Sequence, residues 1–148
     1  MKSLIGQYEV KLTDKGRLAL PVEYRKIIGN KVYVARWYEG CLVIVSSGSW
    51  EALLDRVTAK SAHLTQAVRD TDRFILGSAF EIELDEQGRF VVPKLLREYA
   101  QLAGGVTILG LGDRIEIWDS DAWNKREKII YDSASALLER IAEHDTDK

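Results

Sequence analysis

The sequence predicts an α+β, β-rich fold made of two tandem copies of one unit. A nine-residue stretch, TDKGRLALP at 13–21, nearly recurs as DEQGRFVVP at 85–93, and each stretch ends on one of the chain's two prolines. The segments just before them, YEVKL and FEIEL, alternate apolar and polar residues, which is typical of half-buried strands. Each unit is too small to bury a core comfortably alone, so we expect the copies to pack together with pseudo-twofold symmetry.

The two copies align at an offset of 72 residues. Five of the fourteen positions from Leu12 to Arg25 are identical in the second copy, where about one identity is expected from average residue frequencies. The identical pairs are Leu12 and Leu84, Gly16 and Gly88, Arg17 and Arg89, Pro21 and Pro93, and Arg25 and Arg97. The chain is therefore predicted to be an internal duplication.

In each copy the alternating strand leads into a Gly-containing turn, TDKG or DEQG, and then into a short apolar run, so we expect a β-hairpin. Pro21 and Pro93 suit the first position of a short helix, where a missing N–H costs nothing. Gly29 and the pair Gly104 and Gly105 are expected to end these helices.

A second hairpin is expected in each copy, pairing residues 32–35 with 41–45 and residues 106–109 with 114–118. A helix beginning near Trp50 or Trp123 then closes the copy. The predicted division of the chain is a first half at 1–60, a connecting helix at 61–76, a second half at 77–123, and a C-terminal helix and tail at 124–148.

Two further helices carry apolar stripes. Ser61 can cap a connecting helix whose apolar positions are Leu64, Ala67, Val68, Phe74 and Ile75. After the second copy, a similar stripe comprises Trp123, Ile130, Ala134, Leu137, Leu138 and Ile141. We expect both stripes to cover the protein's own core, and the alternative is a face that binds a partner.

Charge is distributed unevenly along the chain. The net charge of the 148 residues is -2, which alone argues against a polyanionic partner. Residues 1–36, however, hold eight basic and three acidic side chains, whereas the remainder holds thirteen basic and twenty acidic ones. A polyanion is therefore expected to bind the amino-terminal part.

Several classes of protein are not favoured. The single cysteine, Cys41, excludes a disulfide framework, and no run approaches the roughly 20 apolar residues of a membrane span, so we expect a cytoplasmic protein. An enzyme is not expected, since the only histidines are His63 and His144 and no P-loop, metal-ligand spacing or acid–base constellation is present. Neither a cofactor nor a metal is predicted.

The first Gly-Arg turn offers a chemistry for nucleic acid. Gly16 can adopt positive φ and Asp14 can bond the turn backbone, which would leave the guanidinium of Arg17 on a rigid mount. The N–H donors of a planar guanidinium match the O6 and N7 acceptors of guanine, or the oxygens of a phosphate. The predicted DNA-binding residues are Lys11, Asp14, Lys15, Gly16, Arg17 and Arg25. The alternative is that these charges only solvate the surface.

Three segments, GQYEVKLTDKGRLALPVEYRK, AFEIELDEQGRFVVPKLLREYAQL and RIEIWD, together resemble the MraZ family of bacterial regulators. The resemblance runs from about Leu4 to Trp123. It implies that each half is an AbrB-like swapped hairpin and that the two halves pack into one pseudo-twofold barrel with flanking helices.

The resemblance also implies a function. Proteins of this family are sequence-specific transcription factors, associated with the division and cell-wall gene cluster, that form ring-shaped homo-oligomers. They bind short, G-rich direct repeats in double-stranded DNA upstream of their own operon. For this chain we therefore expect a cytoplasmic, nucleoid-associated repressor that assembles into an octamer-like ring and does not enter the membrane.

The family signature Asp-x-x-x-Arg is complete only in the second half, from Asp85 to Arg89; the first half has Thr13 in place of the aspartate. The acidic second motif, Asp85, Gly88 and Arg89, is expected to support the fold or to make oligomer contacts. A second class of function is an antitoxin-like or scaffold protein-interaction module, in which the amphipathic C-terminal helix would be the docking segment.

Overall fold

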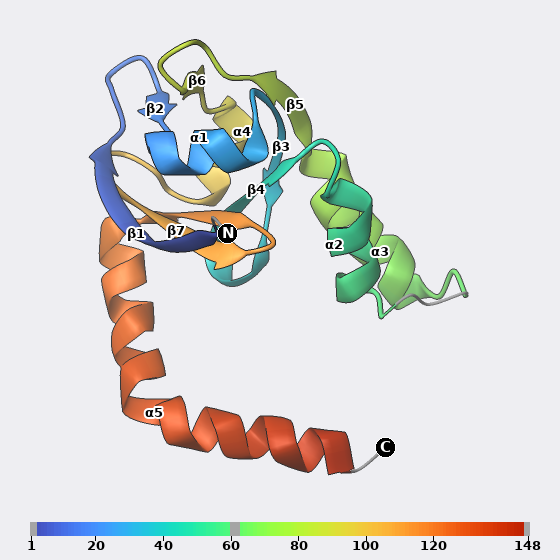
Figure 1. Cartoon of the computed structure of the whole chain (residues 1–148). Helices are drawn as coiled ribbons and strands as arrows, with labels where there is room; N and C mark the ends of the chain where they lie inside the picture. Colours follow the sequence, from blue (N-terminus) through green and yellow to red (C-terminus); the bar gives the residue numbers. More distant parts are fainter. Residues whose placement is uncertain (1–2, 60–62, 147–148) are drawn as a thin grey trace.

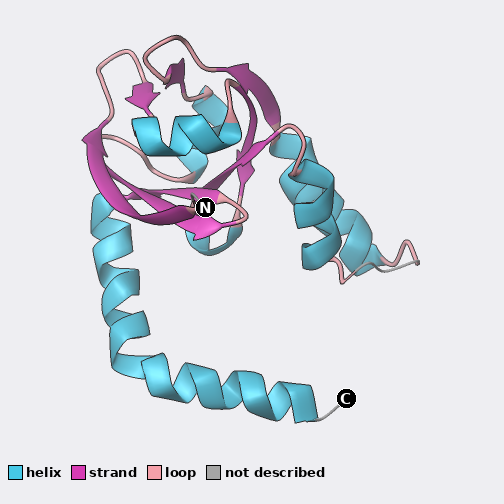
Figure 2. Ribbon diagram, viewed as in Figure 1, coloured by secondary structure: helices cyan, strands magenta, loops and turns pink. Residues whose placement is uncertain are grey.

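A six-stranded sheet in the order β1-β7-β8-β4-β3-β5 forms the body of the protein (Figures 1 and 2). The structure is a computed structural model and describes residues 3–59 and 63–146. The strands of this sheet are β1 Leu4–Lys11, β3 Lys31–Arg36, β4 Leu42–Ser46, β5 Phe80–Glu83, β7 Gly105–Gly112 and β8 Ile115–Asp119. All of their pairings are antiparallel, and the predicted α+β class is confirmed.

The two copies exchange strands in this sheet. Strand β1 of the first copy pairs with β7 of the second, in a register that runs from Leu4 opposite Gly112 to Lys11 opposite Gly105. In turn, β5 of the second copy pairs with β3 of the first. Each copy therefore supplies an outer strand to the other, and neither copy has a complete sheet of its own.

The predicted hairpins at the Gly-Arg turns differ from the observed pairing. The short strands β2 Arg17–Ala19 and β6 Arg89–Val91 pair with each other in a separate two-stranded sheet, rather than with the strand that precedes each turn. This pairing lets Leu18 and Phe90 enter the shared core, where they are 1% and 5% exposed. The local sequence cannot reveal such a partner, because it lies about seventy residues away along the chain.

Short helices follow both prolines. These are helix α1 Val22–Ile28 and helix α4 Lys94–Tyr99. Each begins one residue later than predicted, so that Pro21 and Pro93 are N-cap residues and not the first residues of the helices. Gly29 ends α1, as expected. After α4, however, the left-handed residue is Gln101, with φ 54°, and the predicted Gly104 and Gly105 lie beyond the helix end.

The second hairpins are confirmed, since β3 pairs with β4 and β7 with β8. A 3-10 turn at Tyr38–Gly40 (η1) connects the first pair. Helix α2 Trp50–Val57 begins at the predicted tryptophan, and helix α5 Ser120–Thr146 begins three residues before Trp123.

The connecting segment holds helix α3 Gln66–Ile75 and a 3-10 turn at Leu76–Ser78 (η2). The N-cap of α3 is Thr65, whose hydroxyl accepts a hydrogen bond of 3.3 Å from the N–H of Val68. The expected cap, Ser61, lies outside the described residues. Only the end of the predicted stripe reaches the core, because Ile75 is buried whereas Leu64 is 71% exposed.

Apolar side chains fill both faces of the sheet. Toward α1 and α4 lies a cluster that includes Ile44 and Ile117 of the central strands and the buried Tyr24 of α1. The opposite face carries a second cluster with Val43 and Trp118. Cys41 belongs to this second cluster, and burial raises the pKa of its thiol, as expected for a cysteine that serves in packing.

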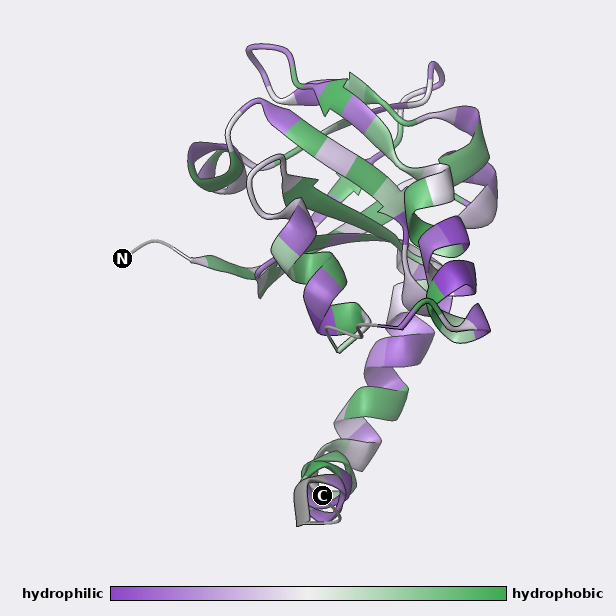
Figure 3. Ribbon diagram, turned by 90° about the vertical axis from the view of Figure 1, so that its right-hand side faces the viewer, coloured by the Kyte–Doolittle hydropathy of each residue, from purple (hydrophilic) through white to green (hydrophobic). Residues whose placement is uncertain are grey.

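Helix α5 leaves the body and carries its apolar residues into solvent (Figures 1 and 3). The exposed fractions are 55% for Ile129, 83% for Tyr131, 70% for Leu138 and 59% for Ile141. The expectation that this stripe covers the protein's own core holds for its first residue, Trp123, which packs against the second cluster, and is wrong for the exposed Leu138 and Ile141. Across residues 3–59 and 63–146, no helix has both the length and the apolar character that a bilayer span requires.

Candidate nucleic-acid interface

Both Gly-Arg turns project from the same end of the molecule, above the paired strands β2 and β6 (Figure 1). In this pairing Arg17 lies opposite Val91, and Ala19 lies opposite Arg89. The pairing between copies thus brings together two motifs that are far apart in the sequence. The candidate site is built from these two turns.

The first turn is closed by Thr13. Its carbonyl accepts a bond of 2.9 Å from the N–H of Gly16, and its hydroxyl oxygen accepts one of 3.0 Å from the N–H of Arg17. Gly16 has the predicted positive φ, 78°. The side-chain bond that was expected from Asp14 is therefore made by the residue before it.

The second turn is closed by Asp85. Its carboxylate accepts bonds from the N–H groups of Gln87 and Arg89, at 2.9 and 2.8 Å, and a third bond of 2.9 Å from Nε of Arg89. The backbone N–H of Arg89, together with these other bonds, holds the pKa of Asp85 below its usual value of 3.8. Asp85 thus fixes both the turn and the arginine side chain.

The two arginines therefore differ in availability. Thr13 reproduces one backbone bond of Asp85 but carries no charge, so it cannot form the ion pair that engages Arg89. Within the part of the chain that the structure describes, the guanidinium of Arg17 has no hydrogen-bond or ion-pair partner. Arg17 is exposed, on a turn whose backbone is held, and its donors are free to bind a ligand.

The role of Asp85 predicts a pH effect on stability. Because the pKa of Asp85 is lowered in the folded state, its contribution is complete above the usual value of 3.8 and is lost as pH falls through the folded pKa. We expect Asp85→Thr, which copies the first turn, to lower the unfolding midpoint at pH 7. The difference in unfolding midpoint between Asp85→Thr and the parent protein should become smaller as the pH falls from about 5 to about 2. Urea unfolding at several pH values measures this difference. A difference that does not change with pH would contradict the role assigned to Asp85.

A hollow of about 400 Å³ lies at the first turn, and Arg89 is the one described residue of its lining that comes from the second copy. Four basic side chains and one acidic side chain line it, together with Thr13, Leu18 and Ala19; the charged residues are Lys11, Asp14, Lys15, Arg17 and Arg89. Five of the predicted DNA-binding or motif residues are thus brought together. Arg89, which was assigned to support or to oligomer contacts, faces the same hollow as Arg17.

Arg25 does not join this group. Its Nη1 donates a bond of 3.1 Å to the carbonyl of Glu86, so the side chain lies against the second turn. The arginine beside the first turn is Arg97, which is close to Gly16. Arg97 was not predicted as a site residue, although its identity with Arg25 in the repeat was a signal that could have identified it.

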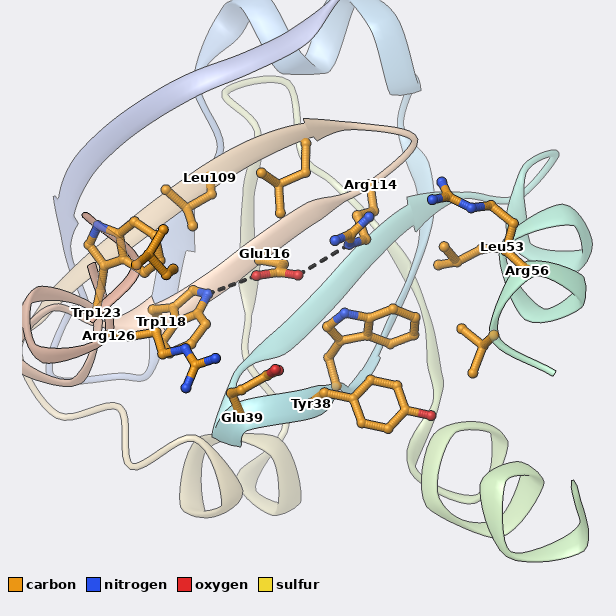
Figure 4. A pocket seen from close by; sticks show the side chains of 14 residues that line it. Tyr38, Glu39, Leu53, Arg56, Leu109, Arg114, Glu116, Trp118, Trp123 and Arg126 are labelled. Atoms are coloured by element: carbon orange, nitrogen blue, oxygen red, sulfur yellow. Dashed lines mark hydrogen bonds and ion pairs between the residues drawn. The ribbon is translucent and has the colours of Figure 1, made fainter. Parts of the chain in front are cut away.

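A second hollow, of about 600 Å³, lies on the other face of the sheet, between α2 and the start of α5 (Figure 4). Trp37, Trp118 and Trp123 give it an aromatic lining. Within it, the carboxylate of Glu116 accepts bonds of 3.0 Å from the indole N–H of Trp118 and 3.1 Å from Nε of Arg114. Among the described residues, the buried indole N–H of Trp123 has no hydrogen-bond partner. The aromatic lining suits an apolar contact surface.

The family of the chain is shown by comparison with known proteins. Residues 4–74 and 75–145 each match the family model described as "MraZ protein, putative antitoxin-like". A protein named "Transcriptional regulator MraZ" from Caldanaerobacter subterraneus subsp. tengcongensis is 34% identical over 142 residues, which cover 95% of each chain.

Two further relatives bear the same name. The protein from Syntrophomonas wolfei subsp. wolfei is 34% identical over 95% of this chain and 94% of its own, and that from Alkaliphilus metalliredigens is 35% identical over 93% and 97%. The duplicated match and the near-complete alignments agree with the repeat seen in the sequence and the fold. The chain therefore belongs to the MraZ family, as two tandem MraZ domains.

Proposed function

We propose that the chain is a sequence-specific transcriptional repressor that binds short, G-rich direct repeats upstream of its own operon, within the division and cell-wall gene cluster. The names of the relatives support a DNA-binding regulator. The observation that carries the proposal is the exposed Arg17, which is mounted on a closed turn beside basic neighbours and has no carboxylate partner among the described residues.

In this proposal Arg17 reads guanine. Its planar fork donates to O6 and N7 in the major groove, and the closed turn reduces the entropy lost when the side chain binds. Lys11 and Lys15 contact phosphates on either side and set the register on the duplex. Asp14 lines the same hollow, where its carboxylate would repel misplaced phosphates. The second motif, Asp85, Gly88 and Arg89, supports the first turn or contacts a neighbouring subunit.

Lys15→Ala separates phosphate contact from base reading. We expect it to weaken binding of operator and scrambled DNA by similar factors and to reduce the slope of log affinity against log salt by about 1. A salt series with both DNAs measures this slope. A loss confined to the operator would reassign Lys15 to base reading.

We further propose that the subunits assemble into an octamer-like ring. A chain with a net charge of -2 gains DNA affinity when several basic hollows face one side of the assembly. Boxes spaced by about 34 Å would meet neighbouring subunits on one face of the DNA. Linked weak contacts of this kind add roughly 10²- to 10⁴-fold in affinity.

The exposed stripe of α5 supports this assembly. Leu138 and Ile141 lie beyond the body, and the aromatic hollow on each subunit is lined by Trp37 and Trp118. We assign the hollow to the α5 stripe of a second copy, because this burial would remove both apolar surfaces from water. The distal helix has acidic residues near its stripe, such as Glu139, and the hollow has the exposed Arg126 at its edge.

The finer fold description is part of the same proposal. Swapped-hairpin AbrB-like halves in one pseudo-twofold barrel would agree with the exchange of β1 and β5 between the copies. The division at residues 1–60, 61–76, 77–123 and 124–148 also stays a prediction, as do the cytoplasmic location and the association with the nucleoid.

A protein-interaction module is the second candidate function. The exposed residues of α5 and the antitoxin-like description of the family favour it. Purification of the tagged chain from its native host tests it directly. Stoichiometric recovery of one different protein, lost when Leu138 and Ile141 are changed to Glu, would favour this function over self-assembly.

The proposed function is tested by fluorescence anisotropy across a salt series, with DNA from just upstream of the gene and a scrambled duplex. We expect tighter binding to the upstream DNA by about 10³-fold or more, the usual range for specific binding. Equal binding to both duplexes at every salt concentration would overturn the proposal.

A further inference from the structure

Each Gly-Arg turn is in contact with an arginine from the opposite copy. Arg97, on α4 of the second copy, lies against the first turn, and a β-carbon added at Gly16 would be 2.7 Å from its Nη1 and 3.0 Å from its Cζ. Arg25, on α1 of the first copy, lies against the second turn, and a β-carbon at Gly88 would be 2.1 Å from its Cδ. The two glycines therefore leave room for the arginines as well as adopting φ of 78° and 75°.

The backbone follows the same crossed pattern. The carbonyl of Gly16 accepts a bond of 2.8 Å from the N–H of Val92, and the carbonyl of Gly88 accepts one of 3.0 Å from the N–H of Leu20. Each of these donors lies in the copy opposite to its turn, just before the proline of that copy. Each turn is thus held by the other copy through one backbone bond and one arginine side chain.

These arginine positions are costly for stability. The Nε atoms of both Arg25 and Arg97 are buried and have no hydrogen-bond partner among residues 3–59 and 63–146. A buried, unpaired N–H of a charged group loses its hydration without compensation. An apolar side chain of similar length, such as methionine, could fill the same space without that cost. Nη1 of Arg25 offsets part of this cost through its bond of 3.1 Å to the carbonyl of Glu86. The position of both guanidinium groups against the turns points to a role in addition to packing.

We infer that Arg97 is a positioning residue for the first turn and holds Arg17 in the orientation that binds DNA, while Arg25 does the same for the turn of Arg89. The inference rests on the proposed DNA-binding function. The planar guanidinium of Arg97 lies against the turn glycine and limits how far the turn can move, so less freedom is lost when Arg17 meets a base. Its charge also adds to the basic hollow.

The pseudo-symmetry supplies a matched pair of variants, Arg97→Lys and Arg25→Lys. Lysine keeps the charge but lacks the planar group, so the support is lost and the electrostatic attraction stays. Amide hydrogen exchange by NMR reports each turn separately, through the N–H groups of Gly16 and Arg17 in the first turn and of Gly88 and Arg89 in the second.

We expect a crossed result. Arg97→Lys should accelerate exchange in the first turn by about tenfold and leave the second turn unchanged, and Arg25→Lys should do the reverse. Amides of the β7–β8 pair should keep their exchange rates in both variants, which separates local support from global destabilisation. Faster exchange in the turn of the same copy, or in neither turn, would overturn the inference.

DNA affinity gives the functional readout. Arg97→Lys should weaken binding to the upstream DNA by about tenfold, and Arg25→Lys by about twofold or less, as expected when one side chain loses its preorganisation. If Arg17→Ala weakens binding but Arg97→Lys does not, the inference fails while the proposed function stands. If the exchange is crossed but Arg17→Ala leaves binding intact, the proposed function fails and the structural support stands.

A double-mutant cycle covers the case in which a lysine variant does not fold. Asparagine tolerates positive φ, so Gly16→Asn mainly tests the contact with Arg97. Its destabilisation should shrink in an Arg97→Ala background and should be additive with Arg25→Ala. Additivity in both backgrounds would show that Arg97 does not interact with the first turn, and would overturn the inference.

Discussion

Arg17→Ala is expected to abolish preference for G-rich repeats while leaving the fold intact. A bidentate contact between arginine and guanine contributes about 1–3 kcal/mol of discrimination, and the loss multiplies when several subunits bind one DNA. The fold should be unaffected because Arg17 is exposed and its side chain has no partner among the described residues. Anisotropy titration with the upstream DNA measures the loss, and circular dichroism checks the fold.

Arg89→Ala is the matched control, since Arg89 lies in the equivalent turn and lines the same hollow. Its guanidinium is already engaged by Asp85, so less binding energy is available for DNA. We expect a smaller loss than for Arg17→Ala. An equal or larger loss for Arg89→Ala would transfer base reading to the second turn.

The double variant Leu138→Glu with Ile141→Glu is expected to release monomers and to weaken DNA binding by roughly 10²- to 10⁴-fold, the contribution of linked sites. Both side chains are mostly exposed in the subunit, so a charge there should not disturb its fold. Placed against the tryptophans of a neighbour's hollow, the two carboxylates would lose hydration, and the apolar contact of the leucine and isoleucine would be lost.

Sedimentation velocity measures the assembly, and the same titration measures the affinity. Ala136→Glu serves as the control because it places one charge on the opposite face of α5, where an exposed residue leaves the stripe intact. The control should stay assembled. An unchanged mass for the double variant would show that the stripe of α5 does not hold the subunits together.

Local signals predicted much of the fold. Alternating segments became strands, short helices followed the two prolines, and the hairpins of β3 with β4 and β7 with β8 formed as expected. Each of these features depends on residues close together in the chain. The exchange of β1 and β5, and the pairing of β2 with β6, depend on contacts between copies, which the period of a strand does not encode.

In the candidate site, too, the local features were predicted from the sequence and the contacts between the two copies were not. The positive φ of Gly16 and the exposure of Arg17 were predicted correctly, because both are local properties. The exchange of Arg25 and Arg97 between turns was missed, since it follows from the pairing of the copies. The apolar stripe of α5 was visible in the sequence, but its period alone does not distinguish a stripe that covers the subunit's core from one that is exposed.

The contact between Arg17 and guanine is tested most directly with DNA in which 7-deazaguanine replaces guanine in the repeats, so that the N7 acceptor is missing. We expect the parent protein to bind this DNA about tenfold or more weakly, which is the lower part of the range for one bidentate pair. Arg17→Ala should bind both DNAs equally. If the parent protein does not distinguish the two DNAs, or if Arg17→Ala distinguishes them as well as the parent does, Arg17 does not read guanine.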